Sequence, residues 1–88
     1  MDTTTTIKDA LKAGTLVIGT KATGRGLKRG SLKAVIICGN APAGVRADLA
    51  RYAQLGQVPL ATFEGDEIAL GEICGKPFAI LAVGVRRA

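Results

Sequence analysis

Short apolar runs and longer segments with helical spacing alternate along the 88-residue chain. A continuous apolar run with β-branched residues is typical of a strand that is covered on both faces. Such runs predict strands at Thr15–Ile18, Lys33–Cys38, Val58–Phe63 and Phe78–Val85. Segments whose apolar residues recur at one face of a 3.6-residue repeat predict amphipathic helices. The helices are expected at Thr6–Ala13, Thr20–Arg29, Ala43–Leu55 and Asp66–Cys74.

The order of these elements predicts an α/β fold. Helices and strands that alternate in this way pack with helices on both faces of a central sheet, which is a three-layer α/β/α sandwich. A chain of 88 residues can build one modest core, so we expect a single domain over residues 1–88. Residues 1–5, which include a run of threonines, are expected to be frayed.

The residue types present exclude several classes of enzyme and site. The chain has no histidine, which excludes a Ser-His-Asp triad, a Cys-His dyad and most zinc sites. Cys38 and Cys74 lie in apolar surroundings without a CxxC pair, so buried, reduced thiols are expected. The longest strongly apolar run, Phe78–Val85, is too short to cross a bilayer, and no signal peptide is evident. We therefore expect a cytoplasmic protein without catalytic residues, cofactor, metal, small-molecule substrate or membrane partner.

Basic residues are concentrated in the first half of the chain. Of the net charge of +5, residues 1–40 contribute seven basic and two acidic side chains, whereas residues 41–88 contribute five of each. Residues 21–33 hold five basic side chains and no acidic one. Such clustering on a globular domain suggests a polyanionic partner, usually a nucleic acid. The alternative is a solvated helix face without a partner.

The glycine-rich stretch Gly19–Gly30 follows a predicted strand, as a phosphate-binding loop would. Gly19 and Gly24 have the spacing of a P-loop, but Arg25 and Gly26 occupy its last two positions. No side chain is then left to hold the metal ion. The dinucleotide-binding pattern also fails, because its last glycine comes one residue late. These departures argue against a nucleotide-handling enzyme.

The same stretch is better explained as a helix that faces RNA. At about 100° per residue, its four basic side chains fall within an arc of roughly 100°. They are Lys21, Arg25, Lys28 and Arg29. Small and apolar residues on the opposite side would pack on the sheet, and the N–H groups near Thr20–Thr23 favour phosphate. Gly24 and Gly26 each cost about 1 kcal/mol relative to alanine in a helix, which a close approach of another group would explain.

Two sets of polar residues have both a structural and a functional interpretation. The carboxylates between residues 64 and 72 resemble an acid–base pair, but Asp66 and Glu67 lie where helix caps lie, and we prefer the structural role. Asn40 either caps the helix that begins near Pro42 or presents its amide to a base edge, and both roles are compatible. Arg46 faces away from the predicted core, so its replacement by alanine is expected to be nearly neutral for binding.

A longer pattern extends from about Ile7 to Val85. In order, its parts are Gly19-Thr20-Lys21, Arg25, Leu27-Lys28, Gly30, Lys33-Ala34-Val35-Ile36-Ile37, Gly39-Asn40-Ala41-Pro42, Tyr52-Ala53-Gln54-Leu55, Val58-Pro59, Phe63-Glu64-Gly65 and Leu70-Gly71-Glu72-Ile73-Cys74-Gly75-Lys76-Pro77-Phe78. With this combination the chain resembles the large-subunit ribosomal proteins of archaea and eukaryotes called "thirty-e", in the superfamily of kink-turn RNA binders. Any one of these parts alone would be a weak signal, whereas the combination is specific.

The resemblance implies the same α/β/α sandwich with a central four-stranded mixed sheet. It implies a kink-turn or similar internal loop with sheared G·A pairs as the bound RNA. Lys21 would reach guanine edges, the residues around it would contact the RNA backbone, and Phe78 would stack on or wedge against an unstacked base. The RNA-binding residues expected in this way are Gly19, Thr20, Lys21, Thr23, Arg25, Lys28, Asn40, Lys76, Pro77, Phe78 and Ala79.

The resemblance also implies a function that is structural rather than enzymatic. We expect a constituent of the large ribosomal subunit, with rRNA and neighbouring ribosomal proteins as partners, which is a monomer away from the ribosome. The alternative is a free-standing kink-turn protein of another ribonucleoprotein. Sister families carry an Asn-Glu pair where this chain has Lys21-Ala22, which favours the ribosomal branch.

Overall fold

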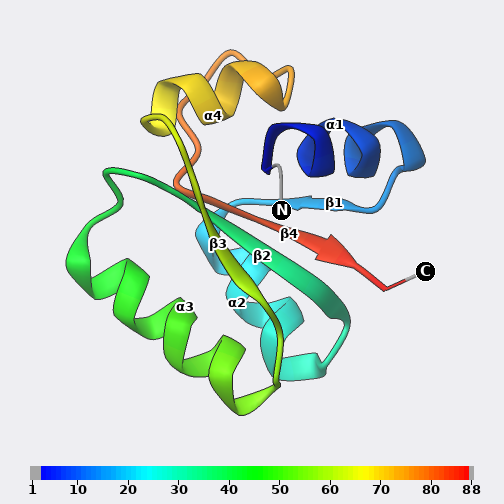
Figure 1. Cartoon of the computed structure of the whole chain (residues 1–88), viewed down its shortest axis with the longest axis vertical. Coiled ribbons are helices and arrows are strands. Elements are labelled where there is room, and N and C mark those ends of the chain that lie inside the picture. Colours follow the sequence, from blue (N-terminus) through cyan, green and yellow to red (C-terminus); the bar gives the residue numbers. More distant parts are fainter. Residues whose placement is uncertain (1–2, 88) are drawn as a thin grey trace.

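Helices and strands alternate along the whole of the described chain, which is residues 3–87 of a computed structural model (Figure 1). The helices are α1 (Thr3–Ala13), α2 (Thr20–Arg29), α3 (Ala43–Leu55) and α4 (Glu67–Ile73). The strands are β1 (Leu16–Ile18), β2 (Leu32–Cys38), β3 (Leu60–Phe63) and β4 (Ala82–Arg86). The predicted order of elements is therefore confirmed.

The four strands form one mixed sheet in the order β1-β4-β2-β3. β2 pairs in parallel with β3, whereas β4 pairs antiparallel with both β1 and β2. Every residue of β2 is buried except Lys33, as the continuous apolar run predicts. β3 lies at an edge, and Pro59 immediately precedes it, in agreement with the rule that keeps proline out of central strands.

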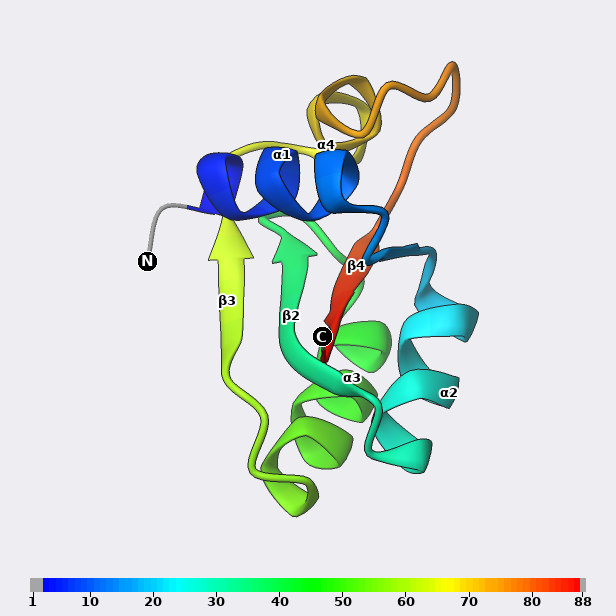
Figure 2. The same ribbon diagram turned by 90° about the vertical axis from the view of Figure 1, so that its right-hand side faces the viewer.

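Helices cover both faces of this sheet, which gives the expected three layers (Figures 1 and 2). Side chains that alternate along β2 point to opposite faces. Ile36 and Cys38 join a buried cluster with Ile7 of α1 and Leu70 of α4. On the other face, Val35 and Ile37 of β2 join the second cluster, together with Leu27 of α2 and Leu49 and Ala53 of α3.

Three boundaries differ from the prediction by two residues or more. α1 begins at Thr3, so residues 3–5 are helical rather than frayed, while residues 1–2 lie outside the described part of the chain. The strand predicted from Val58 begins at Leu60, because the N–H of Val58 donates to the carbonyl of Ala53 and closes the end of α3. The strand predicted from Phe78 begins at Ala82.

The late start of β4 follows from bonds that hold the preceding segment on α4. The N–H of Lys76 donates to the carbonyl of Gly71, and that of Ile80 donates to the carbonyl of Glu67 at 2.9 Å. Gly71 makes this contact possible, because a Cβ at that position would overlap the carbonyl oxygen of Phe78. Residues 76–80 therefore belong to the connection that follows α4 rather than to the sheet.

The two glycines inside α2 have different surroundings. A Cβ on Gly26 would lie 2.9 Å from Cγ of Leu32, so this glycine lets α2 pack closely on the sheet. A Cβ on Gly24 would meet only Cδ2 of Leu49, at an ordinary 3.9 Å. The expected close approach of another group to a helix glycine is thus confirmed for Gly26, where the group is the Leu32 side chain of the protein itself. Gly24 has room for a side chain.

Within residues 3–87, none of the helices is long and apolar enough to span a bilayer. The same residues contain no group of three His, Cys, Asp or Glu side chains placed to share a metal ion.

Candidate nucleic-acid interface

Three segments that are far apart in sequence meet at one end of the sheet. The N–H of Gly19, after β1, donates to the carbonyl of Ala82 at 3.0 Å, and the N–H of Cys38, at the end of β2, donates to the carbonyl of Leu81 at 2.9 Å. These bonds join the start of α2, the turn after β2 and the segment before β4. Figure 2 shows the start of α2 and the segment before β4 on the same side of the molecule. All the predicted site residues belong to α2 or to the other two segments.

The start of α2 is open to an anion. Gly19, at the N-cap position, has φ of 106°, a backbone conformation that glycine adopts far more readily than other residues. Among the described residues, no side-chain hydrogen bond caps the helix at this end. The N–H groups of a first turn without a cap remain available to a ligand, and the helix dipole favours a negative one. Thr20 and the exposed Lys21 are the first two residues of this turn.

The predicted basic face of α2 is confirmed. Its basic side chains are all exposed, and they are Lys21, Arg25, Lys28 and Arg29. On the opposite side of the helix, Thr23 and Leu27 are buried against the sheet. Four cations along one side of a ten-residue helix can each neutralise a phosphate of a bound nucleic acid.

Thr23 differs from the other predicted contact residues. Its exposed fraction is 0%, and its hydroxyl has no hydrogen-bond partner among the described residues. Because the side chain lies beneath the helix rather than on its basic face, it cannot touch an RNA bound there. The expectation that Thr23 contacts RNA is corrected to a role in packing α2 onto the sheet.

A shallow groove of about 370 Å³ runs between α2 and α3 beside this basic face. Lys21, Arg25 and Lys28 line one wall, and residues of α3 that include Tyr52 line the other. The Nζ atom of Lys28 lies 4.9 Å from the centre of the Tyr52 ring, within the range of a cation–π contact. The sequence gives no sign of this contact, because it depends on how the two helices pack against each other.

Asn40 is exposed in the turn between β2 and α3. The N-cap of α3 is Pro42, and within the described part of the chain no side-chain hydrogen bond caps that helix. Of the two interpretations that the sequence left open for Asn40, the capping role is therefore wrong. Its amide is left at the surface, beside the end of the sheet where the three segments meet.

Arg46 anchors the end of the strand that precedes Asn40, a role that the sequence pattern does not indicate. From the first turns of α3, its guanidinium donates to the carbonyl of Cys38 at 3.1 Å and to Oγ1 of Thr62 at 3.2 Å. These bonds tie α3 to the ends of β2 and β3. A helical pattern can show that Arg46 lies off the apolar stripe, but not that its side chain turns back to the sheet.

The segment Lys76–Ala79 is exposed throughout, and Phe78 is 57% exposed. The backbone of this segment is held by α4, as described above, whereas the Phe78 ring borders a hollow of about 260 Å³ with Ile68 and Pro77. An exposed aromatic ring on a fixed backbone is suited to stacking on an unpaired base.

The acidic residues and the thiols near this end have structural roles. Asp66 caps α4, since its carboxylate accepts a bond from the N–H of Ala69 at 2.8 Å, which confirms the predicted cap. Cys38 and Cys74 are free and buried, as expected. Burial raises the pKa of the Cys38 thiol, although the backbone N–H of Asn40 partly counteracts this effect, and burial also raises the pKa of the Cys74 thiol. Both thiols are therefore protonated, unreactive core groups at neutral pH.

Comparison with curated proteins identifies relatives over nearly the whole chain. The chain is 37% identical over 83 residues to a protein of Methanothermobacter thermautotrophicus named large ribosomal subunit protein eL30, covering 94% of this chain and 85% of the relative. It is 40% identical over 83 residues to the protein of the same name from Methanococcus vannielii, covering 94% of this chain and 79% of the relative.

Solved structures with the same fold are more distant in sequence. A 15.5kD RNA binding protein of Giardia lamblia superposes with a TM-score of 0.83 at 20% identity, over 93% of this chain and 68% of that one. A protein of unknown function from Bacillus halodurans has the same TM-score and identity, over 100% of this chain and 88% of that one. The family model described as "Ribosomal protein L7Ae/L30e/S12e/Gadd45 family" matches residues 1–88. The chain therefore belongs to the ribosomal protein L7Ae/L30e/S12e/Gadd45 family.

Proposed function

We propose that the chain is a non-enzymatic constituent of the large ribosomal subunit that binds a kink-turn or similar internal loop of rRNA. The observation that carries this proposal is the meeting of the open start of α2, the Asn40 turn and the Phe78 segment at one end of the sheet. The names of its relatives, which are large ribosomal subunit proteins, support the assignment to that subunit.

The start of α2 supplies the contacts to the RNA backbone and to the guanines. Lys21 reaches acceptor atoms on guanine edges where the groove is opened by the kink. Gly19 and Thr20 place N–H groups of the first turn against phosphate, and Arg25 and Lys28 continue the phosphate contacts along α2. RNA is read at such irregular sites because the grooves of a regular RNA helix offer side chains little sequence information.

The other two segments contact the unpaired part of the loop. Asn40 presents its exposed amide to a base edge, and the Phe78 ring packs against a base that has left the stack. Lys76 adds a cation beside that base, while Pro77 and Ala79 shape the surface around the ring. Three kinds of contact at one end of the sheet suit an RNA with a sharp bend, because a straight duplex cannot reach all three.

The partners that follow are rRNA and the ribosomal proteins that adjoin the site. Away from the cytoplasmic ribosome, the chain is a monomer. The rival assignment, a free-standing kink-turn protein of another ribonucleoprotein, would use the same RNA-binding residues. Purified large subunits distinguish the two, because only a ribosomal constituent co-migrates with them in stoichiometric amount after a high-salt wash.

The experiment that tests the RNA preference is a titration of the protein into two labelled RNAs of equal length, one with a kink-turn and one fully paired, at two salt concentrations. We expect a preference for the kinked RNA that persists at the higher salt, because shape-specific contacts add to the phosphate contacts. Equal affinities that fall together as salt rises would reduce α2 to a nonspecific basic patch and overturn the proposal.

A further inference from the structure

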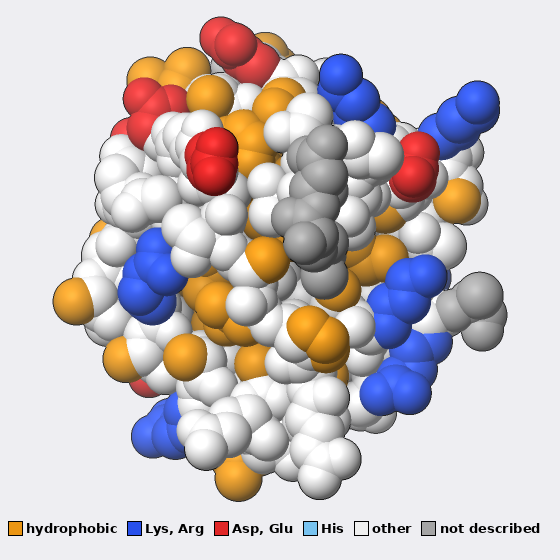
Figure 3. Space-filling view, in the orientation of Figure 1, with side chains coloured by type: hydrophobic (Ala, Val, Ile, Leu, Met, Phe, Trp, Pro, Cys, Tyr) orange, Lys and Arg blue, Asp and Glu red, His pale blue; other side chains and the backbone are white. Residues whose placement is uncertain are grey.

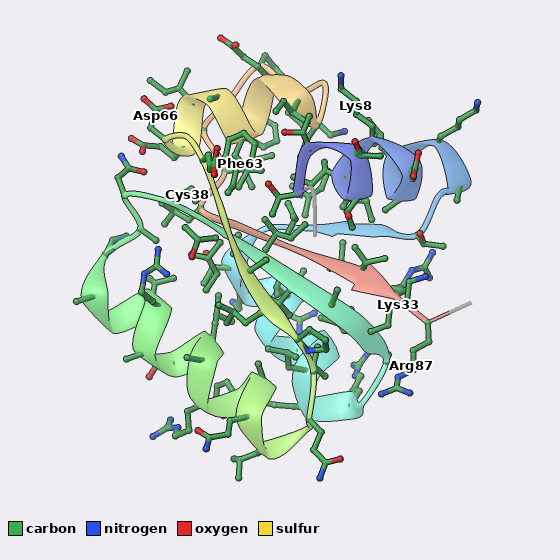
Figure 4. All side chains as sticks on the ribbon, in the orientation of Figure 1. Lys8, Lys33, Cys38, Phe63, Asp66 and Arg87 are labelled. Atoms are coloured by element: carbon green, nitrogen blue, oxygen red, sulfur yellow. The ribbon has the colours of Figure 1, made fainter. Side chains whose placement is uncertain are left out.

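A second group of cations lies at the end of the sheet away from the proposed kink-turn site. Arg29 ends α2, Lys33 lies on β2, and Arg86 and Arg87 lie at and just beyond the end of β4. All four side chains are exposed. In Figure 4, Lys33 and Arg87 lie together at the end of the sheet opposite to Cys38, and Figure 3 shows a cluster of basic side chains there. The four residues are named here the far-end patch.

Backbone pairing fixes these residues next to one another. Arg86 is paired with Leu32, and a register shift between Leu32 and Ala34 leaves Lys33 outside the regular ladder. The N–H of Arg87 donates to the carbonyl of Ser31 at 2.9 Å, which places Arg87 beside the turn that follows Arg29. The far-end patch is therefore built by the antiparallel pairing of β2 and β4 rather than by neighbouring positions in sequence.

The charge of the far-end patch is largely uncompensated. Within residues 3–87, none of its four cations takes part in an ion pair. The guanidinium of Arg86 donates to the carbonyl of Gly14 at 2.7 Å, a bond that orients the group without neutralising it. Asp9, which borders the same hollow as Lys33, is an acidic side chain close to the patch. Among the side chains of residues 3–87, four cations near the carboxylate of Asp9 give a surface that attracts a polyanion.

The distance from the first site makes the far-end patch a separate surface. Lys33 and Cys38 are five residues apart on β2, which is about 17 Å at 3.3 Å per residue. Lys21, Asn40 and Phe78 lie at the Cys38 end, as described above. Arg29 adjoins Lys28, the last α2 residue assigned to the first RNA, so it lies where the two surfaces border each other. An internal loop held at the Cys38 end leaves Lys33, Arg86 and Arg87 free for another molecule.

The chemistry of the far-end patch fits RNA better than protein. Three of its four cations are arginines, whose guanidinium groups bind phosphate through two parallel hydrogen bonds. Protein interfaces have apolar or aromatic centres, yet none of the exposed large hydrophobic side chains of the described chain lies on β2 or β4. A regular RNA duplex presents phosphates without exposed bases, so it matches a surface of cations that has no stacking residue.

We propose that the far-end patch binds the phosphate backbone of a second, base-paired RNA segment while the kink-turn occupies the opposite end of the sheet. The protein thereby links two RNA segments. The simultaneous binding rests on the proposed function for the first RNA, whereas the far-end patch itself can be tested without it.

The test compares two double variants that lose the same charge. K33Q/R87Q removes two cations of the far-end patch, and Arg86 is kept because its bond to Gly14 supports the fold. K8Q/K12Q removes two exposed cations of α1 and serves as the control. Each protein is saturated with unlabelled kink-turn RNA and titrated into a labelled duplex without internal loops, at several salt concentrations, with fluorescence anisotropy as the readout.

We expect the wild-type complex to bind the duplex without releasing the kink-turn RNA. K33Q/R87Q should bind the duplex about tenfold more weakly, and its slope of log affinity against log salt should be shallower by about two, as expected when two phosphate contacts are lost. K8Q/K12Q should change the affinity for the duplex less than twofold. Neither variant should alter the affinity for the kink-turn RNA more than twofold.

Three results would overturn the proposal. Equal losses in both double variants would mean that total charge, not the far-end patch, binds the duplex. Release of the kink-turn RNA by the duplex would mean that both RNAs share one site. Complete displacement of the duplex by poly-glutamate at equal concentration of negative charge would favour an acidic protein as the partner. If the kink-turn RNA itself binds no better than a duplex, the proposed function fails. The same two double variants, titrated into the duplex without kink-turn RNA, then still show whether the far-end patch binds RNA.

Discussion

Arg46 and Phe78 illustrate two ways in which a single residue can serve the proposed RNA site. Arg46 acts from inside the protein, through bonds to the carbonyl of Cys38 and to Thr62. Phe78 acts at the surface, with 57% of its side chain exposed on a segment that α4 holds in place. The first residue should therefore affect both folding and binding, whereas the second should affect binding alone.

Replacing Arg46 with alanine removes both bonds and should lower the free energy of unfolding by about 1–2 kcal/mol. The Asn40 turn then loses its anchor, so the affinity for kink-turn RNA should also fall, while the salt dependence of binding stays unchanged because no phosphate contact is lost. Chemical denaturation and RNA titration at several salt concentrations measure the two effects. In an Asn40→Ala background, Arg46→Ala should cause little further loss of affinity.

Arg51 on the same helix provides the matched control. Its side chain is 63% exposed and pairs with Asp48 at 3.8 Å, so Arg51→Ala should change stability by less than about 0.5 kcal/mol. If Arg46→Ala behaved like Arg51→Ala in both measurements, the side chain would be an ordinary surface cation, as the sequence pattern suggested.

Lys21→Ala and Phe78→Ala should each weaken kink-turn binding by about 1–3 kcal/mol, because one loses the proposed contact to a base edge and the other the proposed stacking surface. Neither change should alter the melting temperature by more than a few degrees, since both side chains are exposed. Lys12→Ala, on the exposed side of α1, is the control for loss of one charge. Similar losses from all three variants would indicate diffuse electrostatic binding.

At the scale of elements, α2 has to meet two structural requirements, and its two glycines differ in which one they affect. The helix must pack closely on β2, and it must present a basic face to solvent. Gly26 serves the packing, because Leu32 fills the space that a side chain would need. Gly24 lies beside the groove between α2 and α3, where a Cβ would meet Leu49 at an ordinary distance.

Alanine at these two positions should therefore have opposite effects on stability. Gly24→Ala should raise the free energy of unfolding by about 1 kcal/mol, because alanine is the better helix former and no atom must move. Gly26→Ala should lower it by about 1–2 kcal/mol, because the fully buried Leu32 must shift to admit the methyl group. Urea denaturation of the two variants gives the sign of each change in the free energy of unfolding. The same sign for both would show that helix propensity alone determines the effect of substitutions in α2.

The sequence predicted those elements whose pattern is decided locally. The apolar run of β2 and the periodicity of α2 and α3 were sufficient, and the exposed cations of α2 followed directly from its periodicity. The start of β4 was missed because residues 76–80 bond to α4, a contact between elements that no local pattern contains. The Lys28–Tyr52 and Arg46–Cys38 contacts were missed for the same reason, since each joins α3 to a different element.

At the scale of the whole molecule, two buried thiols make folding sensitive to alkaline pH. Burial raises the pKa of Cys38 and of Cys74 above the ordinary value of 9.0 that applies to the unfolded chain. Below that pH both states keep the thiol protons, so stability is unaffected. Above it the unfolded chain loses protons that the folded protein retains, and stability falls as pH rises.

We therefore expect the free energy of unfolding to decrease between pH 9 and pH 10.5, by at most about 1.4 kcal/mol per pH unit for each thiol. The C38A/C74A variant should be less stable at pH 7, because it loses buried volume, but its stability should depend less on pH above 9. Denaturant titrations at a series of pH values measure both slopes. If the stability of the two proteins fell equally steeply with pH, the loss of stability above pH 9 would come from other titratable groups.

The position of β4 has a consequence for how the protein is made. Among the strands of residues 3–87, β4 comes last in sequence, yet it lies between β1 and β2 in the sheet. Until residues 82–86 have been synthesised and have left the translating ribosome, β1 has no strand partner, and the bonds of Gly19 to Ala82 and of Cys38 to Leu81 cannot form. The end of the sheet that gathers α2, Asn40 and the Phe78 segment is thus assembled in one late step. A growing chain therefore lacks the complete proposed RNA site until that step, and it acquires the site only when β4 is inserted between β1 and β2.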